Sequence, residues 1–152
     1  KSHKLSVIHG TGFTSRINGN ELHVTLPVGV DPSSSQAQHF IKEAALKALR
    51  TQAKAYLSRR LESLACQHGF HYETIRFSNA GTRWGSCSSN GTISLNIWLM
   101  QLPFELIDYV LIHELCHTRH MNHSDRFWSL VEGIVPDYRE RRRALKAERP
   151  YL

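Results

Sequence analysis

Eleven residues, from His113 to His123, contain the side-chain types of a metal-dependent hydrolase at a spacing that can hold one ion. His113 and His117 are four residues apart, so on a helix they share a face and can bind the same metal. Glu114 lies next to the first of them, where a carboxylate can take a proton from a water that the metal activates. The composition of the chain predicts about 0.04 chance matches to this pattern. We therefore predict a catalytic site with one Zn²⁺ ion and with Glu114 as the catalytic base.

The third metal ligand has two candidates, His120 and His123. His120 lies three residues after His117 and shares a face with it if the helix continues. His123 lies farther along, where the chain can turn back and complete three corners of a tetrahedron. We predict His123, because this arrangement leaves the fourth position open for water, as in catalytic rather than structural zinc sites.

The helix that carries the first two ligands must end before His123 for this ligand set to close. Ten residues along one helix would separate His113 and His123 by about 15 Å. We expect the helix to end within residues 119–122, with Asn122 in a left-handed conformation. Ser124 is then the predicted N-cap of a new helix.

The N-terminal part of the chain is expected to form strands. Residues 4–9 and 21–28 alternate apolar and polar side chains. Asn18, Gly19 and Asn20 lie between them and tolerate positive φ angles. We predict that the two segments pair as a hairpin.

A long helix is predicted to follow, from about residue 36 to residue 68, where apolar side chains recur at helical spacing. The serines at 33–35 offer an N-cap, and Gly69 is a stop signal at the other end. Because such a helix is unusually long for a globular domain, a break near Thr51 is expected.

The site itself is expected to rest on a short antiparallel sheet and a helix with a buried stripe. Residues 72–78 are predicted to form a strand, and Asn90-Gly91 predicts a hairpin within residues 82–96. Pro103 then begins a helix. The apolar stripe that anchors this helix consists of Leu106, Ile107, Val110, Leu111 and Leu115.

The length of 152 residues predicts a single domain, residues 1–152. Its predicted parts are N-terminal strands in residues 1–32, a long helix in 33–69, a sheet with a hairpin in 70–100, and the active-site and C-terminal helices in 103–149. The chain lacks an apolar run of the ~18 residues needed to cross a bilayer and the apolar core of a secretory signal. The three cysteines, without a CxxC pair, argue against a disulfide framework. A cytoplasmic protein is expected.

The formal net charge of +6 and the pI near 9.5 favour anionic partners. Much of this charge lies in the last helical segment, with Arg139, Arg141, Arg142, Arg143, Lys146 and Arg149. These residues form either a solvated helical face or a contact surface for a polyanion.

Several separated motifs follow one another along the chain: residues 82–88, 93–96, Pro103, 107–117, 122–124, 127–128 and 136–138. Together they resemble the YgjP-like metallopeptidase family. The resemblance implies metal ligands His113, His117 and His123, with Glu114 as the base. It also implies an α+β fold with a small gluzincin-like core, related in outline to the SprT and WLM metallopeptidases. The spacing from His117 to His123 equals that of metzincins, but His120 replaces their glycine, which argues against a metzincin turn.

The substrate has two candidate classes. A strand beside the site of such metallopeptidases usually pairs with an extended peptide, whereas the resemblance also implies hydrolysis of UTP to UMP and pyrophosphate. The candidate substrate-binding residues are Arg83, Asn96, His120 and Tyr138. A zinc-stabilised nucleic-acid-binding module is a third hypothesis, and the free Glu114 argues against it. The sequence leaves the oligomeric state open.

Overall fold

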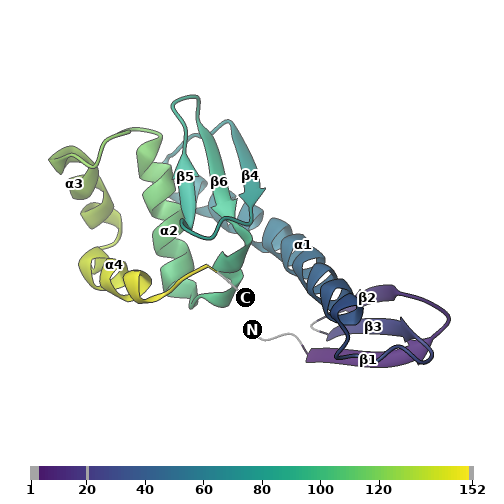
Figure 1. Ribbon diagram of the computed structural model, residues 1–152. Helices are drawn as coiled ribbons and strands as arrows, with labels where there is room; N and C mark the ends of the chain where they lie inside the picture. Colours follow the sequence, from purple (N-terminus) through teal and green to yellow (C-terminus); the bar gives the residue numbers. More distant parts are fainter. Residues whose placement is uncertain (1–3, 20, 151–152) are drawn as a thin grey trace. The chain divides into compact units, whose positions relative to one another are not determined.

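The protein is described by a computed structural model that covers residues 4–19 and 21–150. It forms two compact units, Lys1–Gln52 and Ala53–Leu152, and each contains a three-stranded sheet (Figure 1). The first unit also contains the first part of one long helix, and the second unit contains the rest of that helix and the remaining helices. The predicted α+β class is confirmed. That the whole chain acts as one domain stays a prediction. None of the described helices is both long enough and apolar enough to cross a membrane.

The sheet of the first unit has the strand order β1-β3-β2, with β1 at Lys4–Gly10, β2 at Thr14–Asn18 and β3 at Glu21–Pro27. Strand β1 is parallel to β3, and β2 is antiparallel to it. The predicted hairpin between residues 4–9 and 21–28 is therefore wrong. The hairpin joins β2 to β3, with Gly19 at φ +58° in its turn, while Asn20 lies outside the described residues. Strand β2 is exposed along its whole length, so it carries no apolar alternation by which to predict it.

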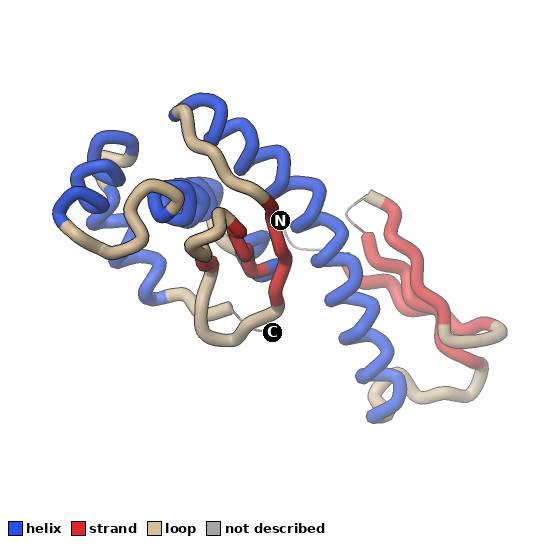
Figure 2. Tube along the Cα trace, turned by 90° about the horizontal axis from the view of Figure 1, so that it is seen from above, coloured by secondary structure: helices blue, strands red, loops and turns tan. Residues whose placement is uncertain are grey.

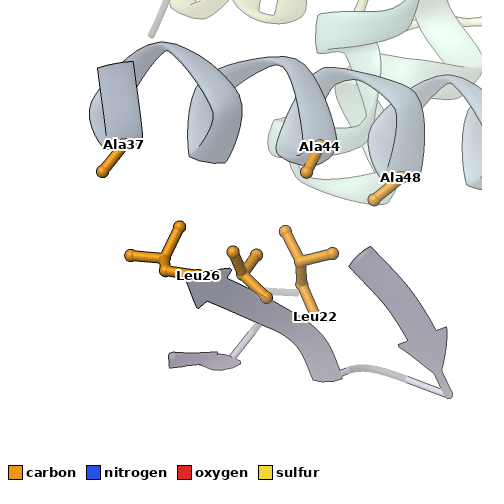
Figure 3. Packing of buried hydrophobic residues seen from close by; sticks show 6 residues of the cluster. Leu22, Leu26, Ala37, Ala44 and Ala48 are labelled. Atoms are coloured by element: carbon orange, nitrogen blue, oxygen red, sulfur yellow. The ribbon is translucent and has the colours of Figure 1, made fainter. Parts of the chain in front are cut away.

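The core of the first unit lies between β3 and the first part of a long helix (Figure 3). Every second residue of β3 faces this helix, as the two-residue period of a strand requires. Small helix residues opposite them allow a close approach of helix and sheet. The buried cluster consists of Leu22, Val24, Leu26, Ala37, Ala44 and Ala48.

The long helix α1 spans Ser35–His68 and belongs to both units, since its residues lie on either side of the boundary after Gln52. Its predicted ends are confirmed: the Ser34 hydroxyl accepts the Ala37 N–H at 3.3 Å, and Gly69 follows with φ +66°. The break predicted near Thr51 is wrong, because the helix is continuous over 34 residues (Figure 2). The Thr51 hydroxyl donates to the Lys47 carbonyl within the helix, so it needs no other partner.

The sheet of the second unit has the order β4-β6-β5, with β4 at Thr74–Ser78, β5 at Gly85–Cys87 and β6 at Thr92–Asn96. The predicted hairpin is confirmed as the antiparallel pair of β5 and β6. The prediction of a purely antiparallel sheet is wrong, since β4 is parallel to β6. The loop after β4 leads to β5, which forms the opposite edge of the sheet. The hairpin then reverses the chain, so that β6 lies between β4 and β5 and runs parallel to β4.

Four helical segments complete the second unit: the 3₁₀ segment η1 (Ile97–Gln101), α2 (Phe104–His117), α3 (Asp125–Ile134) and α4 (Tyr138–Ala147). Helix α2 begins after Pro103, as predicted. It lies along β5 on one side and against α3 and α4 on the other (Figure 1). An ion pair joins it to α1, where the Arg60 guanidinium donates to both oxygens of Asp108 at 2.8 and 2.7 Å.

Candidate metal centre

Three imidazoles meet at the end of α2. The Nε2 atoms of His113, His117 and His123 lie 3.1–3.2 Å from one another. Three ligands held 2.0–2.1 Å from a tetrahedral zinc ion lie about 3.3 Å apart. The triad therefore fits one face of a tetrahedral metal site, and it includes His123 rather than His120, as predicted.

The protonation of His113 and His117 suits metal binding. The Nδ1 atom of His117 lies 3.0 Å from the His120 carbonyl, which can only accept, so the proton is on Nδ1 and the Nε2 lone pair is free. Burial, and then the proximity of His117 and His123, lower the pKa of His113 to about 3. Burial also lowers the pKa of His117. Neutral rings with lone pairs converging on one point repel each other unless a cation lies between them.

The chain between the second and third ligands turns without any left-handed residue. Helix α2 ends at His117, earlier than predicted, with Thr118 as its C-cap. The N–H groups of Arg119 and His120 both donate to the Cys116 carbonyl, at 3.1 and 3.0 Å. The left-handed conformation predicted for Asn122 is wrong, since no non-glycine residue in 4–19 or 21–150 has a positive φ. Helical and extended backbone conformations are sufficient to bring His123 back to the site.

Arg119 anchors this turn to the C-terminal end of α1. Its guanidinium donates to the Gly69 carbonyl at 2.6 Å and lies over the Phe70 ring, 4.3 Å from the centroid. Arg119 was not among the residues predicted from the sequence to shape the site. Its partners lie about fifty residues earlier in the chain, so no local pattern points to this contact.

Helix α3 supports the triad with two aromatic side chains. Its predicted cap is confirmed, because the Ser124 hydroxyl accepts the Phe127 N–H at 3.4 Å. The fully buried Phe127 ring lies 4.4–4.9 Å from all three imidazoles. Trp128 stacks on His123 at 5.5 Å. These rings exclude water from one side of the metal site, a role that the sequence analysis missed although both follow closely after His123.

Glu114 lies beside the triad and is almost completely enclosed, with 5% of its surface exposed. Burial raises its pKa to about 8, and the positive charge of Arg83 opposes this rise. The contact with strand β5 is made at Gly85, where a Cβ would lie 2.8 Å from both Cγ and Oε1 of Glu114. Only glycine at this position allows the strand to approach the carboxylate so closely.

Two of the candidate substrate-binding residues, Arg83 and Asn96, meet in the loop before β5. The completely buried Asn96 amide donates to the Ala80 and Arg83 carbonyls at 2.6 and 2.9 Å, and its oxygen accepts the Trp98 N–H. In the structure Asn96 thus holds the shape of this loop. The Arg83 side chain is exposed.

The other two candidates, His120 and Tyr138, lie behind the triad. His120 contributes its carbonyl to His117, and its ring is partly exposed. Tyr138 is buried and stacks on Trp128 at 5.3 Å, and the Arg139 guanidinium lies over the Tyr138 ring, 5.0 Å from its centroid. In the structure both stabilise the surroundings of the imidazoles.

A cleft of about 490 Å³ opens beside His113 and Glu114. One wall is the loop before β5 and the start of that strand, with Gly81, Thr82, Trp84 and Gly85. The opposite wall is α4 and the residues after it, with Arg142, Leu145, Lys146, Glu148, Arg149 and Pro150. Tyr109 also lines the cleft, and burial raises its pKa to about 12, so its hydroxyl keeps its proton and can donate.

Comparisons with known proteins found two similar solved structures. The crystal structure of the metallopeptidase zymogen of Pyrococcus abyssi abylysin matches with a TM-score of 0.54 and 27% identity, over 60% of this chain and 92% of that one. The zymogen of Methanocaldococcus jannaschii jannalysin matches with a TM-score of 0.45 and 20% identity, over 51% and 79%. No curated protein matches at a significant level.

The family comparison covers almost the whole sequence. The model of the YgjP-like metallopeptidase domain matches residues 1–148, which include both sheets and all three histidines of the triad. The chain therefore belongs to the YgjP-like metallopeptidase family.

Proposed function

We propose that the protein is a zinc-dependent peptidase that uses Glu114 as its general base. The observation that carries this proposal is the convergence of three imidazoles beside a buried carboxylate at the side of an open cleft. Membership of the family and the likeness to a metallopeptidase zymogen support it. Three nitrogen ligands leave a fourth position open, as catalytic zinc sites require.

The metal and two side chains of the site have separate roles in the proposed reaction. When bound, zinc lowers the pKa of a water molecule and polarises the carbonyl of the scissile bond. Glu114, buried beside the triad, takes the proton of the attacking water and passes it to the leaving amine. The protonated Tyr109 hydroxyl in the cleft wall can donate to the oxygen on which negative charge develops.

A peptide substrate is supported by the position of β5. This strand lies at one edge of the sheet β4-β6-β5 and, among the strands of the described residues, pairs with β6 alone. Gly85, its first residue, also lines the cleft. An extended peptide can therefore add to this edge by backbone hydrogen bonds, with its scissile bond near Glu114.

Substitution Glu114→Gln tests the proposal. The amide cannot take a proton, so peptide cleavage should fall about 10²-fold or more while bound zinc, measured by elemental analysis, is unchanged. The matched control is Glu105→Gln, since Glu105 is exposed at the beginning of the same helix. Full cleavage of unfolded protein substrates by the Glu114 variant would contradict the role of this residue.

Hydrolysis of a nucleoside triphosphate such as UTP is a second candidate function. The basic wall of the cleft favours it, because Arg142, Lys146 and Arg149 can attract phosphates. A nucleotide panel incubated with the same two variants tests it. Glu114-dependent release of UMP, without peptide cleavage, would replace the peptidase proposal.

A further inference from the structure

Four of the five basic residues of α4 fall into two groups. Arg139 donates to Glu132 at 3.1 Å and Arg141 to Asp137 at 2.8 Å, so their charges are balanced by ion pairs. Arg142 and Lys146 line the cleft instead. Neither forms an ion pair with any carboxylate in the described part of the chain.

Arg142 is held beside the metal centre by an aromatic contact. Its guanidinium lies over the Trp128 ring, 4.7 Å from the centroid, and Trp128 in turn stacks on His123. A cation–π contact uses the face of the guanidinium and leaves the N–H donors at its edges for a ligand. The charge is therefore placed at a defined position near the reacting atoms.

Lys146 lies one helical turn after Arg142, on the same face of α4. Two like charges at this spacing repel each other, and this repulsion destabilises the folded protein unless an anion lies between them. Arg149 adds a third positive charge to this wall, and Glu148 is its single carboxylate. Such a wall has a net positive charge and attracts anionic groups, among them a carboxylate.

We propose that Arg142 and Lys146 form an anion subsite that binds an acidic side chain of the peptide substrate, close to the scissile bond. This inference rests on the proposed peptidase function and adds a substrate class to it. The planar guanidinium of Arg142 matches a carboxylate with two parallel hydrogen bonds, and the ammonium of Lys146 adds a charge that can adjust its position.

Binding to an inactive enzyme tests the subsite directly. Two fluorescent peptides that differ only by Glu or Gln at one position are titrated into zinc-loaded Glu114→Gln protein, and their anisotropy is measured. At the position that reaches the subsite, the Glu peptide should bind about 10-fold more tightly than its Gln counterpart. This preference should weaken as salt is raised.

Substitutions on α4 then assign the preference to its residues. Adding Arg142→Gln or Lys146→Gln should reduce the ratio of the two dissociation constants toward one, whereas Arg143→Gln, on the same helix but outside the cleft, should leave it unchanged. Lys146→Gln leaves the contact between Arg142 and Trp128 intact. A loss of the preference in this variant therefore cannot result from a displaced Trp128. An unchanged preference in both cleft variants would overturn the subsite.

Turnover by the unmodified enzyme separates the two proposals. Cleavage of both peptides with equal kcat/KM would overturn the subsite and leave the peptidase function intact. Tighter binding of the Glu peptide without cleavage of either would overturn the peptidase function and leave the subsite intact. Inorganic triphosphate that binds through Arg142, while the two peptides bind equally, would overturn the assignment to a carboxylate.

Discussion

The Glu114 side chain contacts strand β5 at Gly85, a residue without a side chain. A Cβ at Gly85 would lie 2.8 Å from the Glu114 carboxylate, so Gly85→Ala must displace the carboxylate from its place beside the imidazoles. Because a displacement of about 1 Å can cost up to 10²-fold in rate, we expect kcat to fall 10- to 10²-fold. Zinc content should stay the same, since none of the ligands is moved.

The matched control for this prediction is Gly133→Ala in α3. A Cβ at Gly133 meets nothing within 4 Å, and alanine is the better helix former. This variant should retain full activity and unfold at slightly higher denaturant concentration. If Gly85→Ala retained wild-type kcat, the close contact would have no part in positioning the base.

Single residues of the site differ in how far the sequence predicts them. His113, Glu114 and His117 follow from helical spacing, and His123 from the need to close a tetrahedron, because these constraints are local. The contact of Gly85 with Glu114 joins segments that are nearly thirty residues apart. No local pattern encodes such a contact. The same reason explains why Arg119 was missed and why Asn96, a candidate for substrate binding, has its amide engaged by the loop before β5.

An ion pair with two hydrogen bonds connects helix α2 to α1. Asp108 and Arg60 are partly buried, so their attraction is less screened than that of an exposed pair. We expect Asp108→Asn to lower the free energy of unfolding by about 1–2 kcal/mol. Urea unfolding followed by circular dichroism measures this change.

An exposed ion pair supplies the comparison. Glu132→Gln removes the carboxylate that pairs with Arg139 at the surface, and its effect should stay below about 0.5 kcal/mol. Equal effects of the two substitutions would mean that the connection between α1 and α2 does not depend on the Asp108 pair.

The elements were predicted best where local signals specify their ends. Ser34 and Gly69 at α1, Pro103 at α2 and Ser124 at α3 all lie where capping chemistry requires them. Sheet topology was predicted less well. The parallel pairings of β1 with β3 and of β4 with β6 depend on contacts across the unit rather than on neighbouring residues.

At the scale of the whole molecule, the metal site and the tryptophans lie in the same compact unit. Trp84, Trp98 and Trp128 all fall within residues 53–152, as does the triad. A metal that binds only the folded protein at 100 times its dissociation constant adds about 2.7 kcal/mol to the free energy of unfolding. For a chain of this length we expect zinc to raise the midpoint of tryptophan-detected thermal unfolding by about 5–10 °C.

Circular dichroism of helix α1 gives a second measurement, which reports on the unfolding of both units. Its 34 residues belong to both units, and the first unit has a small core of three branched residues and three alanines. A core of this size gives little stability by itself, so we expect the first unit to unfold together with the second. Circular dichroism should then show the same zinc-dependent shift as fluorescence. The control His123→Ala should abolish both shifts, and a shift seen by fluorescence alone would show that the two units unfold independently.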